Sequence, residues 1–227
     1  MKKEVLILGV IAAIVIGAGI WLAVSSAPKP LGVGQAIDPK ALIRTHSRMT
    51  GKIDSTVTLV EFGDYQCPAC GAAHPVIKQL LKDYEGKSIN FVFRNFPLPM
   101  HGNAFLAAEA AESAGKQNKF WEMHDKLYEN QNQWAESTTA KDIFISYAGD
   151  IGLNTDQFTQ DLNRRSFQDI INKDMEDGNK LGVDATPTFY LNGEKWTKGY
   201  KLDEFKKAID GLLSKQPTVP AEATTTP

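Results

Sequence analysis

The chain has 227 residues, of which 42% are hydrophobic and 23% charged, and its formal net charge at pH 7 is −2. This length and hydrophobic content suit one globular domain with a sizeable core and room for an insertion. The near-neutral charge gives no support for a nucleic-acid partner, which needs clustered positive charge.

The first predicted element is apolar. Residues 5–24 carry no charge, and a helix of that length spans the roughly 30 Å core of a bilayer. Trp21 lies near the outer end, where interfacial aromatic residues are common. We therefore expect residues 1–24 to be a single-pass transmembrane anchor. The alternative is a signal peptide cleaved near residues 23–25, but the run is longer than the roughly 7–15 apolar residues usual there. Both interpretations place the remaining chain outside the cytoplasm, in the periplasm or on the outer face of the cell membrane.

Residues 25–37, rich in Pro, Gly and small side chains, are expected to form a linker. Asp38 and Pro39 have the pattern of a helix N-terminus and begin the predicted folded domain, residues 38–214. Residues 215–227 are rich in Pro, Thr and Ala and are predicted to be a disordered tail.

The folded domain is predicted to be α/β. Residues 56–62 are β-branched and apolar, a helical pattern follows Pro68, and a second strand begins at Ser88, so a parallel pair with a helical crossover is expected. Helical patterns then fill an all-α insertion at about residues 101–182. Asn192-Gly193 is typical of a tight hairpin turn, and an amphipathic helix follows it. The order predicts an α/β fold with a helical insertion.

The segment EFGDYQCPACG contains the only two cysteines, Cys67 and Cys70. A structural disulfide is poorly supported, because closing so short a loop stabilises a fold little. A metal site of Cys67, Cys70 and His74 lacks the second cysteine pair of a closed zinc site. An extracytoplasmic location allows a disulfide to persist, which leaves a redox-active pair as the favoured hypothesis.

A cysteine at a helix N-terminus has its thiolate stabilised by backbone N–H groups and the helix dipole. We expect Cys67 there to be exposed and to act as the nucleophile, and Cys70, one turn further, to be the partly covered resolving thiol. Glu61 on the preceding strand is expected to lie beneath the pair and to exchange a proton with Cys70. The alternative for Glu61 is a solvated charge at a strand end.

The motifs EFGDYQCPAC, VDATPTFYLNG, FRNFPLP and FWEMHDKLYENQ resemble the DsbA-like thiol:disulfide oxidoreductases, especially the membrane-anchored bacterial DsbA/BdbD-like proteins. The resemblance covers roughly residues 51–213. It implies a thioredoxin fold with a helical insertion, no cofactor besides the Cys67–Cys70 disulfide, and a cis-proline loop at Thr186-Pro187. It also implies that Pro68, Ala69, Thr186 and Pro187 contact substrate. Ala69 and Thr186 differ from the histidine and valine of the best-studied member.

The resemblance implies an enzyme that introduces disulfides into unfolded or folding cysteine-containing proteins and is reoxidised by a DsbB-like or VKOR-like membrane partner. Disulfide isomerase or reductase activity is an alternative, as is a non-catalytic module that binds a metal or a peptide. No resident metal is expected. Asp64 and Tyr65 are expected to shape the turn before Cys67, His101 to cap the next helix, and His124 to pack within the insertion.

Overall fold

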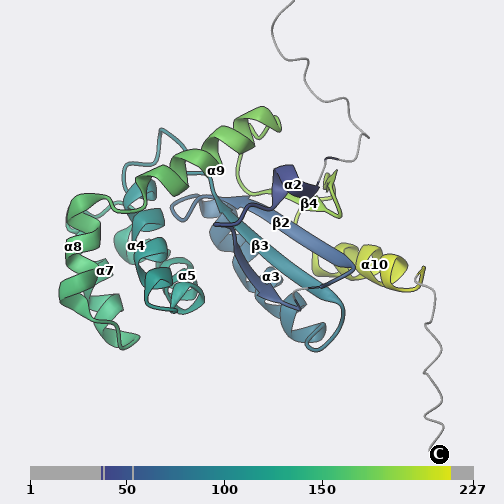
Figure 1. Ribbon diagram of the computed structural model, residues 1–227, viewed down its shortest axis with the longest axis horizontal. Coiled ribbons are helices and arrows are strands. Elements are labelled where there is room, and N and C mark those ends of the chain that lie inside the picture. The colour runs from purple at the N-terminus through teal and green to yellow at the C-terminus, as the bar shows by residue number, and fades with distance from the viewer. Residues whose placement is uncertain (1–36, 38, 53, 216–227) are drawn as a thin grey trace, which may run out of the picture. The chain divides into compact units, whose positions relative to one another are not determined.

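The computed structural model describes residues 37, 39–52 and 54–215 (Figure 1). Within these residues no helix is long and apolar enough to cross a membrane. The predicted anchor at residues 5–24, most of the linker, Asp38 and nearly all of the predicted tail lie outside the described residues.

The described residues contain a five-stranded sheet in the order β1-β3-β2-β4-β5. β2 and β3 are parallel, as the sequence predicts, whereas the other neighbouring pairs are antiparallel. The strands are β1 (Arg48–Gly51), β2 (Val57–Gly63), β3 (Ile89–Asn95), β4 (Thr188–Leu191) and β5 (Glu194–Lys195). Strand β1 was not predicted, because its four residues show no apolar alternation.

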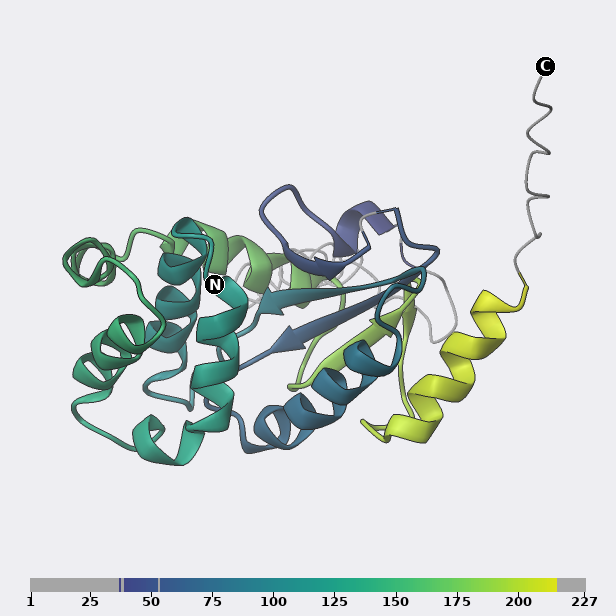
Figure 2. The same ribbon diagram turned by 90° about the horizontal axis from the view of Figure 1, so that it is seen from below.

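The crossover helix and the insertion helices lie where the sequence places them. The helices are α2 (Pro39–Leu42), α3 (Pro68–Asp83), α4 (Ala104–Lys116), α5 (Phe120–Glu129), α6 (Gln131–Trp134), α7 (Ala140–Asp150), α8 (Thr155–Arg164), α9 (Gln168–Lys180) and α10 (Leu202–Leu213). Helices α4 to α8 gather to one side of the sheet, while α3 and α10 lie along one of its faces (Figures 1 and 2).

The alternation of side chains along the central strands divides the core between the two faces of the sheet. Leu59 and Phe93 belong to the larger core, which includes buried residues of α3, α10 and the insertion. Val60 and Tyr190 belong to a smaller core with Leu42 of α2. Because Glu61 follows Leu59 by two residues, its side chain shares the face that α3 covers.

A tight turn after β4 and buried ion pairs between β3 and α9 stabilise the ends of the sheet. In the predicted hairpin turn, Asn192 and Gly193 have φ values of 49° and 87°, the left-handed backbone that an Asn-Gly turn supplies. At the junction with the insertion, fully buried Arg94 pairs with Asp174 at 2.5 Å and Asp177 at 2.7 Å. This buried ion pair ties β3 to α9.

Candidate active site

The active-site turn connects the end of β2 to the start of α3. Cys67 occupies the N-cap position with extended backbone, and Pro68 is the first helical residue. Proline fits there because the first helical N–H groups have no partner within the helix. The Cys67 N–H donates to the Asp64 carbonyl at 3.1 Å, which closes the turn. The predicted helix start is therefore confirmed.

Asp64 fixes this turn from inside the protein. Its buried carboxylate accepts from the Gln66 N–H at 2.7 Å and from the Leu98 N–H at 2.8 Å. His101 Nδ1 lies 2.6 Å from the same carboxylate, and Asn103 occupies the N-cap position of α4. The expected turn role of Asp64 is confirmed. The His101 ring contacts Asp64 and does not cap α4, although the His101 carbonyl accepts from the Ala104 N–H at 3.2 Å.

The insertion reaches the turn through Gln131. Its side-chain amide donates to the Tyr65 carbonyl at 2.7 Å and to the Cys67 carbonyl at 2.9 Å. The Gln131 amide oxygen also lies so close to Gly71 that a Cβ there would be 2.7 Å away. Sequence reasoning missed Gln131, since only three-dimensional contact links it to the cysteines.

Cys67 is less accessible than expected. Its exposed fraction is only 7%, because the Thr186-Pro187 loop covers the end of α3. The Cys67 thiol donates to the Thr186 carbonyl at 3.3 Å, and the Thr186-Pro187 peptide bond is cis, as the resemblance implied. Substrate must therefore approach a sulfur recessed between α3 and this loop.

The thiolate of Cys67 is strongly favoured. Its pKa is lowered from 9.0 to about 5, first by a hydrogen bond from Cys70 and then by hydrogen bonding from Thr186 and from the first backbone N–H groups of α3, against the opposing effect of burial. The Thr186 hydroxyl is buried and has no hydrogen-bond partner elsewhere among the described groups. It is thus a donor available to the thiolate.

Cys70 and Glu61 have the opposite tendency. Cys70 is fully buried, and burial together with the Cys67 hydrogen bond raises its pKa well above the usual value. Glu61 is 3% exposed, and burial and the nearby Cys67 raise its pKa to about 8. The alternative of a solvated strand-end charge is therefore wrong. The site combines an ionised outer sulfur with a protonated inner one and a buried carboxyl that titrates near neutral pH.

The residues expected to contact substrate surround Cys67. Pro68 is exposed, Ala69 and Pro187 are half-buried, and Thr186 is buried. They come from the start of α3 and from the loop before β4, so a polypeptide at Cys67 would contact both segments. Their substrate-binding role stays a prediction.

The aromatic and histidine residues behind the turn form a separate group. The Tyr65 hydroxyl lies 3.0 Å from His124 Nδ1, and burial lowers the pKa of His124 to about 3. His74 Nε2 lies 2.9 Å from Asp125 Oδ1. His74 therefore pairs with α5, and within the described residues it does not group with the cysteines as metal ligands.

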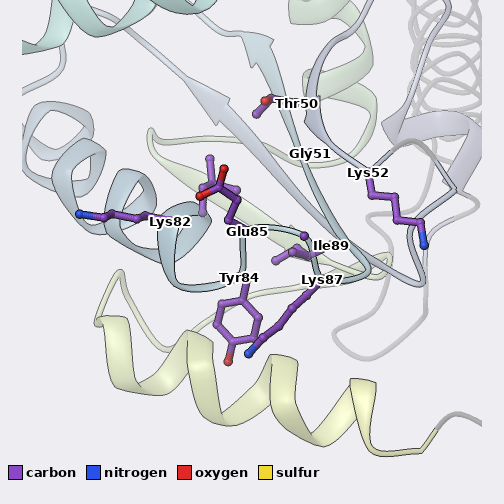
Figure 3. Close-up of a pocket in the computed structure, with 10 residues that line it drawn as sticks. Thr50, Gly51, Lys52, Lys82, Tyr84, Glu85, Lys87 and Ile89 are labelled. Atoms are coloured by element: carbon purple, nitrogen blue, oxygen red, sulfur yellow. The ribbon is translucent and has the colours of Figure 1, made fainter.

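A cavity of about 570 Å³ lies at the far end of α3 from the cysteines (Figure 3). In Figure 3 Tyr84 and Lys87 lie side by side above α10, and Lys82 points away from the cavity. The Tyr84 hydroxyl donates to Asp210 at 2.6 Å. The cavity is lined by β1, the end of α3, the loop that follows it and the start of β3, and none of its lining residues belongs to the turn that carries the cysteines.

The sequence comparisons agree with the fold. The family described as thioredoxin matches residues 44–211. The chain is 34% identical over 171 residues to the "Probable disulfide bond formation protein D" of Bacillus cereus, covering 73% of this chain and 78% of that protein. It is also 36% identical over 179 residues to the "Na(+)/H(+) antiporter NhaA 1" of Salinispora arenicola, covering 78% of this chain but only 26% of the antiporter. The chain spans about a quarter of the length of these antiporter relatives.

The crystal structure of oxidised BdbD from Bacillus subtilis matches with a TM-score of 0.69 and 29% identity, over 80% of this chain and 98% of that one. A structure of alpha-DsbA1 from Wolbachia pipientis has the same TM-score at 23% identity, covering 77% of this chain and 94% of that one, a likeness of fold.

Proposed function

Because the chain belongs to the thioredoxin family and is built like its DsbA/BdbD-type members, we propose that it is a protein thiol:disulfide oxidoreductase that introduces disulfides into cysteine-containing proteins. The observation that carries the proposal is the difference between the two thiols. At pH 7 Cys67 favours the thiolate, while buried Cys70 favours the thiol. A thiolate that is stabilised in the reduced state makes the disulfide a stronger oxidant.

The reaction begins when a substrate thiolate attacks Sγ of Cys67 in the Cys67–Cys70 disulfide. The bond between the two protein sulfurs breaks, a mixed disulfide forms at Cys67, and Cys70 leaves as a thiolate that takes up one proton. A second substrate thiolate then attacks the substrate sulfur of the mixed disulfide, and Cys67 leaves as a thiolate. The substrate loses two electrons, and the protein gains them as a dithiol.

Glu61 is suited to supply the proton that Cys70 takes up. It lies on the sheet face beneath α3, and its carboxyl is electrostatically coupled to both sulfurs. With a pKa of about 8, it holds a proton at pH 7 and can lose it at little cost, which is the property of an efficient general acid. A buried carboxyl otherwise costs stability, so a catalytic role explains its presence.

Oxidation of reduced ribonuclease by the oxidised chain tests this proposal. Wild type should transfer one disulfide per chain. Cys67→Ser should be inactive, and Cys70→Ser, which cannot form the Cys67–Cys70 disulfide, should transfer no disulfide either. Full activity of Cys67→Ser would overturn the proposal.

The equilibrium with glutathione separates oxidase from reductase or isomerase. A potential nearer −120 mV supports donation of disulfides, and one near −270 mV supports a reductase. The reduced chain then needs an electron acceptor, for which a DsbB-like or VKOR-like membrane protein is the proposed class.

We also propose that residues 5–24 hold the domain at the outer face of the cell membrane. The support is the length of this uncharged run. Membrane fractionation after alkaline washing should retain the full chain and release a variant that lacks residues 1–24. Release of both would contradict anchoring.

A further inference from the structure

Two histidines and a carboxylate converge between α3 and α5, behind the redox turn. His74 lies one helical turn after Cys70, and His124 and Asp125 are neighbours on α5. One ligand atom from each of the three lies within 4.8 Å of the other two. We propose that these three side chains bind one divalent transition-metal ion, Zn²⁺ being the best match.

The present separations are close to those of a metal site. His74 Nε2 and Asp125 Oδ1 are 2.9 Å apart. Zinc bonds of about 2.0–2.1 Å in tetrahedral geometry place ligand atoms about 3.3 Å from one another. Since the three ligand atoms lie within 4.8 Å of one another, no two of them need to approach by more than about 1.5 Å to reach this geometry. The Asp125 side chain is 37% exposed, so its carboxylate has room to rotate toward an ion.

His124 is held as a metal ligand would be. The Tyr65 hydroxyl contacts its Nδ1 at 3.0 Å, which leaves Nε2 as the nitrogen available to an ion. A partner on the second ring nitrogen is the usual way in which proteins orient a ligating histidine. His124 is only 5% exposed, yet with His74 and Asp125 it lines a cavity of about 160 Å³. That volume also admits water as a further ligand.

The donor set selects the kind of ion. Two imidazoles and one carboxylate suit Zn²⁺ and other transition ions, whereas Ca²⁺ and Mg²⁺ prefer oxygen ligands alone. Lys78 opposes binding, because its ammonium donates to Asp125 Oδ2 at 2.8 Å. It also donates to Glu129 at 2.7 Å and can keep that partner when Asp125 turns to an ion. An ion here would tie α5 of the insertion to α3.

Equilibrium dialysis with Zn²⁺ alone tests the proposal, using the full chain with Cys67→Ser and Cys70→Ser so that no thiol competes. One Zn²⁺ per chain should bind, and Co²⁺ should give visible d–d bands that Zn²⁺ removes. Ca²⁺ should not compete. Absence of saturable Zn²⁺ binding, or competition by Ca²⁺, would overturn the proposal.

Substitutions locate the site. Asp125→Asn preserves the shape of a half-exposed side chain and should weaken Zn²⁺ binding at least tenfold, and His124→Gln should weaken it further. His46→Gln, a histidine outside the group, is the matched control and should bind as before. Circular dichroism in the presence of a chelator checks that each variant is folded. If Asp125→Asn binds Zn²⁺ as tightly as its parent, the site is not this one.

In a second pair of variants, one substitution should increase the affinity for Zn²⁺ instead of lowering it. Lys78→Met removes a like charge and should tighten Zn²⁺ binding roughly two- to fivefold. Lys180→Met removes the same charge from α9 and should leave the affinity unchanged. Unchanged or weaker binding in Lys78→Met would contradict an ion at Asp125.

Discussion

Replacing Cys67 with serine should remove a pH-dependent contribution to the stability of the reduced chain. The pKa of Cys67 is about 5 in the folded chain against 9.0 for a free thiol. Because the folded value is the lower one, the thiolate stabilises the fold fully above about pH 9, and this stabilisation is lost as the pH falls through about 5. At pH 7, two pKa units above the folded value, it amounts to about 3 kcal/mol, at about 1.4 kcal/mol per unit. Solvent screening near the surface end of α3 reduces it to roughly 2 kcal/mol.

Titration of Glu61 changes the free energy of unfolding in the opposite direction with pH, so its contribution must be removed from the comparison. Its folded pKa of about 8 lies above its ordinary value of 4.5. Its contribution to stability is therefore fully present below about pH 4.5 and is lost as the pH rises through about 8. The two effects overlap between about pH 5 and 8, so the comparison belongs in a Glu61→Gln background.

Urea unfolding of Glu61→Gln and of Glu61→Gln/Cys67→Ser, both fully reduced, is the assay. The difference in unfolding free energy between them should grow by roughly 2 kcal/mol from about pH 4 to pH 7. Cys70→Ser in the same background is the control, because a serine hydroxyl can still donate to the thiolate. Parallel profiles for the first two variants would refute the reasoning. The thiolate stabilises the reduced chain by this roughly 2 kcal/mol, which makes the reduction potential of the Cys67–Cys70 disulfide about 40 mV more oxidising.

Three further changes probe the site. Glu61→Gln should slow the release of Cys70 from the disulfide about a hundredfold at pH 7, because the proton donor is lost. It should also remove the pKa near 8 from the pH dependence of the rate, measured by stopped-flow reaction of the oxidised chain with a dithiol peptide. An unchanged pH profile would exclude proton transfer by Glu61. Thr186→Val should raise the pKa of Cys67 through loss of a hydrogen bond, seen by ultraviolet thiolate absorbance, while Thr188→Val, whose hydroxyl donates to a carbonyl elsewhere, should not. Gln131→Ala should lower the free energy of unfolding by about 1–3 kcal/mol, since it leaves two carbonyls of the turn without their donor; a loss close to zero would mean that water replaces the amide.

The central fold was predictable because its elements have strong local signals. β2 and β3 are rich in β-branched and aromatic residues, Pro68 marks the start of α3, and Asn192-Gly193 marks the hairpin. The four residues of β1 have no such signal and form a strand only because the edge of β3 is available for pairing. Edge pairing of this kind is a tertiary effect that local sequence does not encode.

In the candidate site too, local sequence predicts some features, while others depend on contacts between distant segments. The placement of Cys67 and Cys70 at the start of a helix and of Glu61 on the strand before it followed from their spacing, while their catalytic roles stay predictions. The burial of Cys67 did not, because it is covered by Thr186, 119 residues along the chain. Gln131 was missed for the same reason.

The thiolate of Cys67 owes its stability to neutral donors rather than to a cation. The main groups that lower its pKa among the described residues are the Cys70 thiol, Thr186 and backbone N–H groups at the start of α3. Ala69 stands between the cysteines and carries no charge. Since Cys70 is the first of these donors, the thiolate of Cys67 is most stable while Cys70 keeps its proton. Glu61, which is coupled to both sulfurs, can therefore influence the potential as well as the rate. We therefore expect the reduction potential to depend on the charge of Glu61.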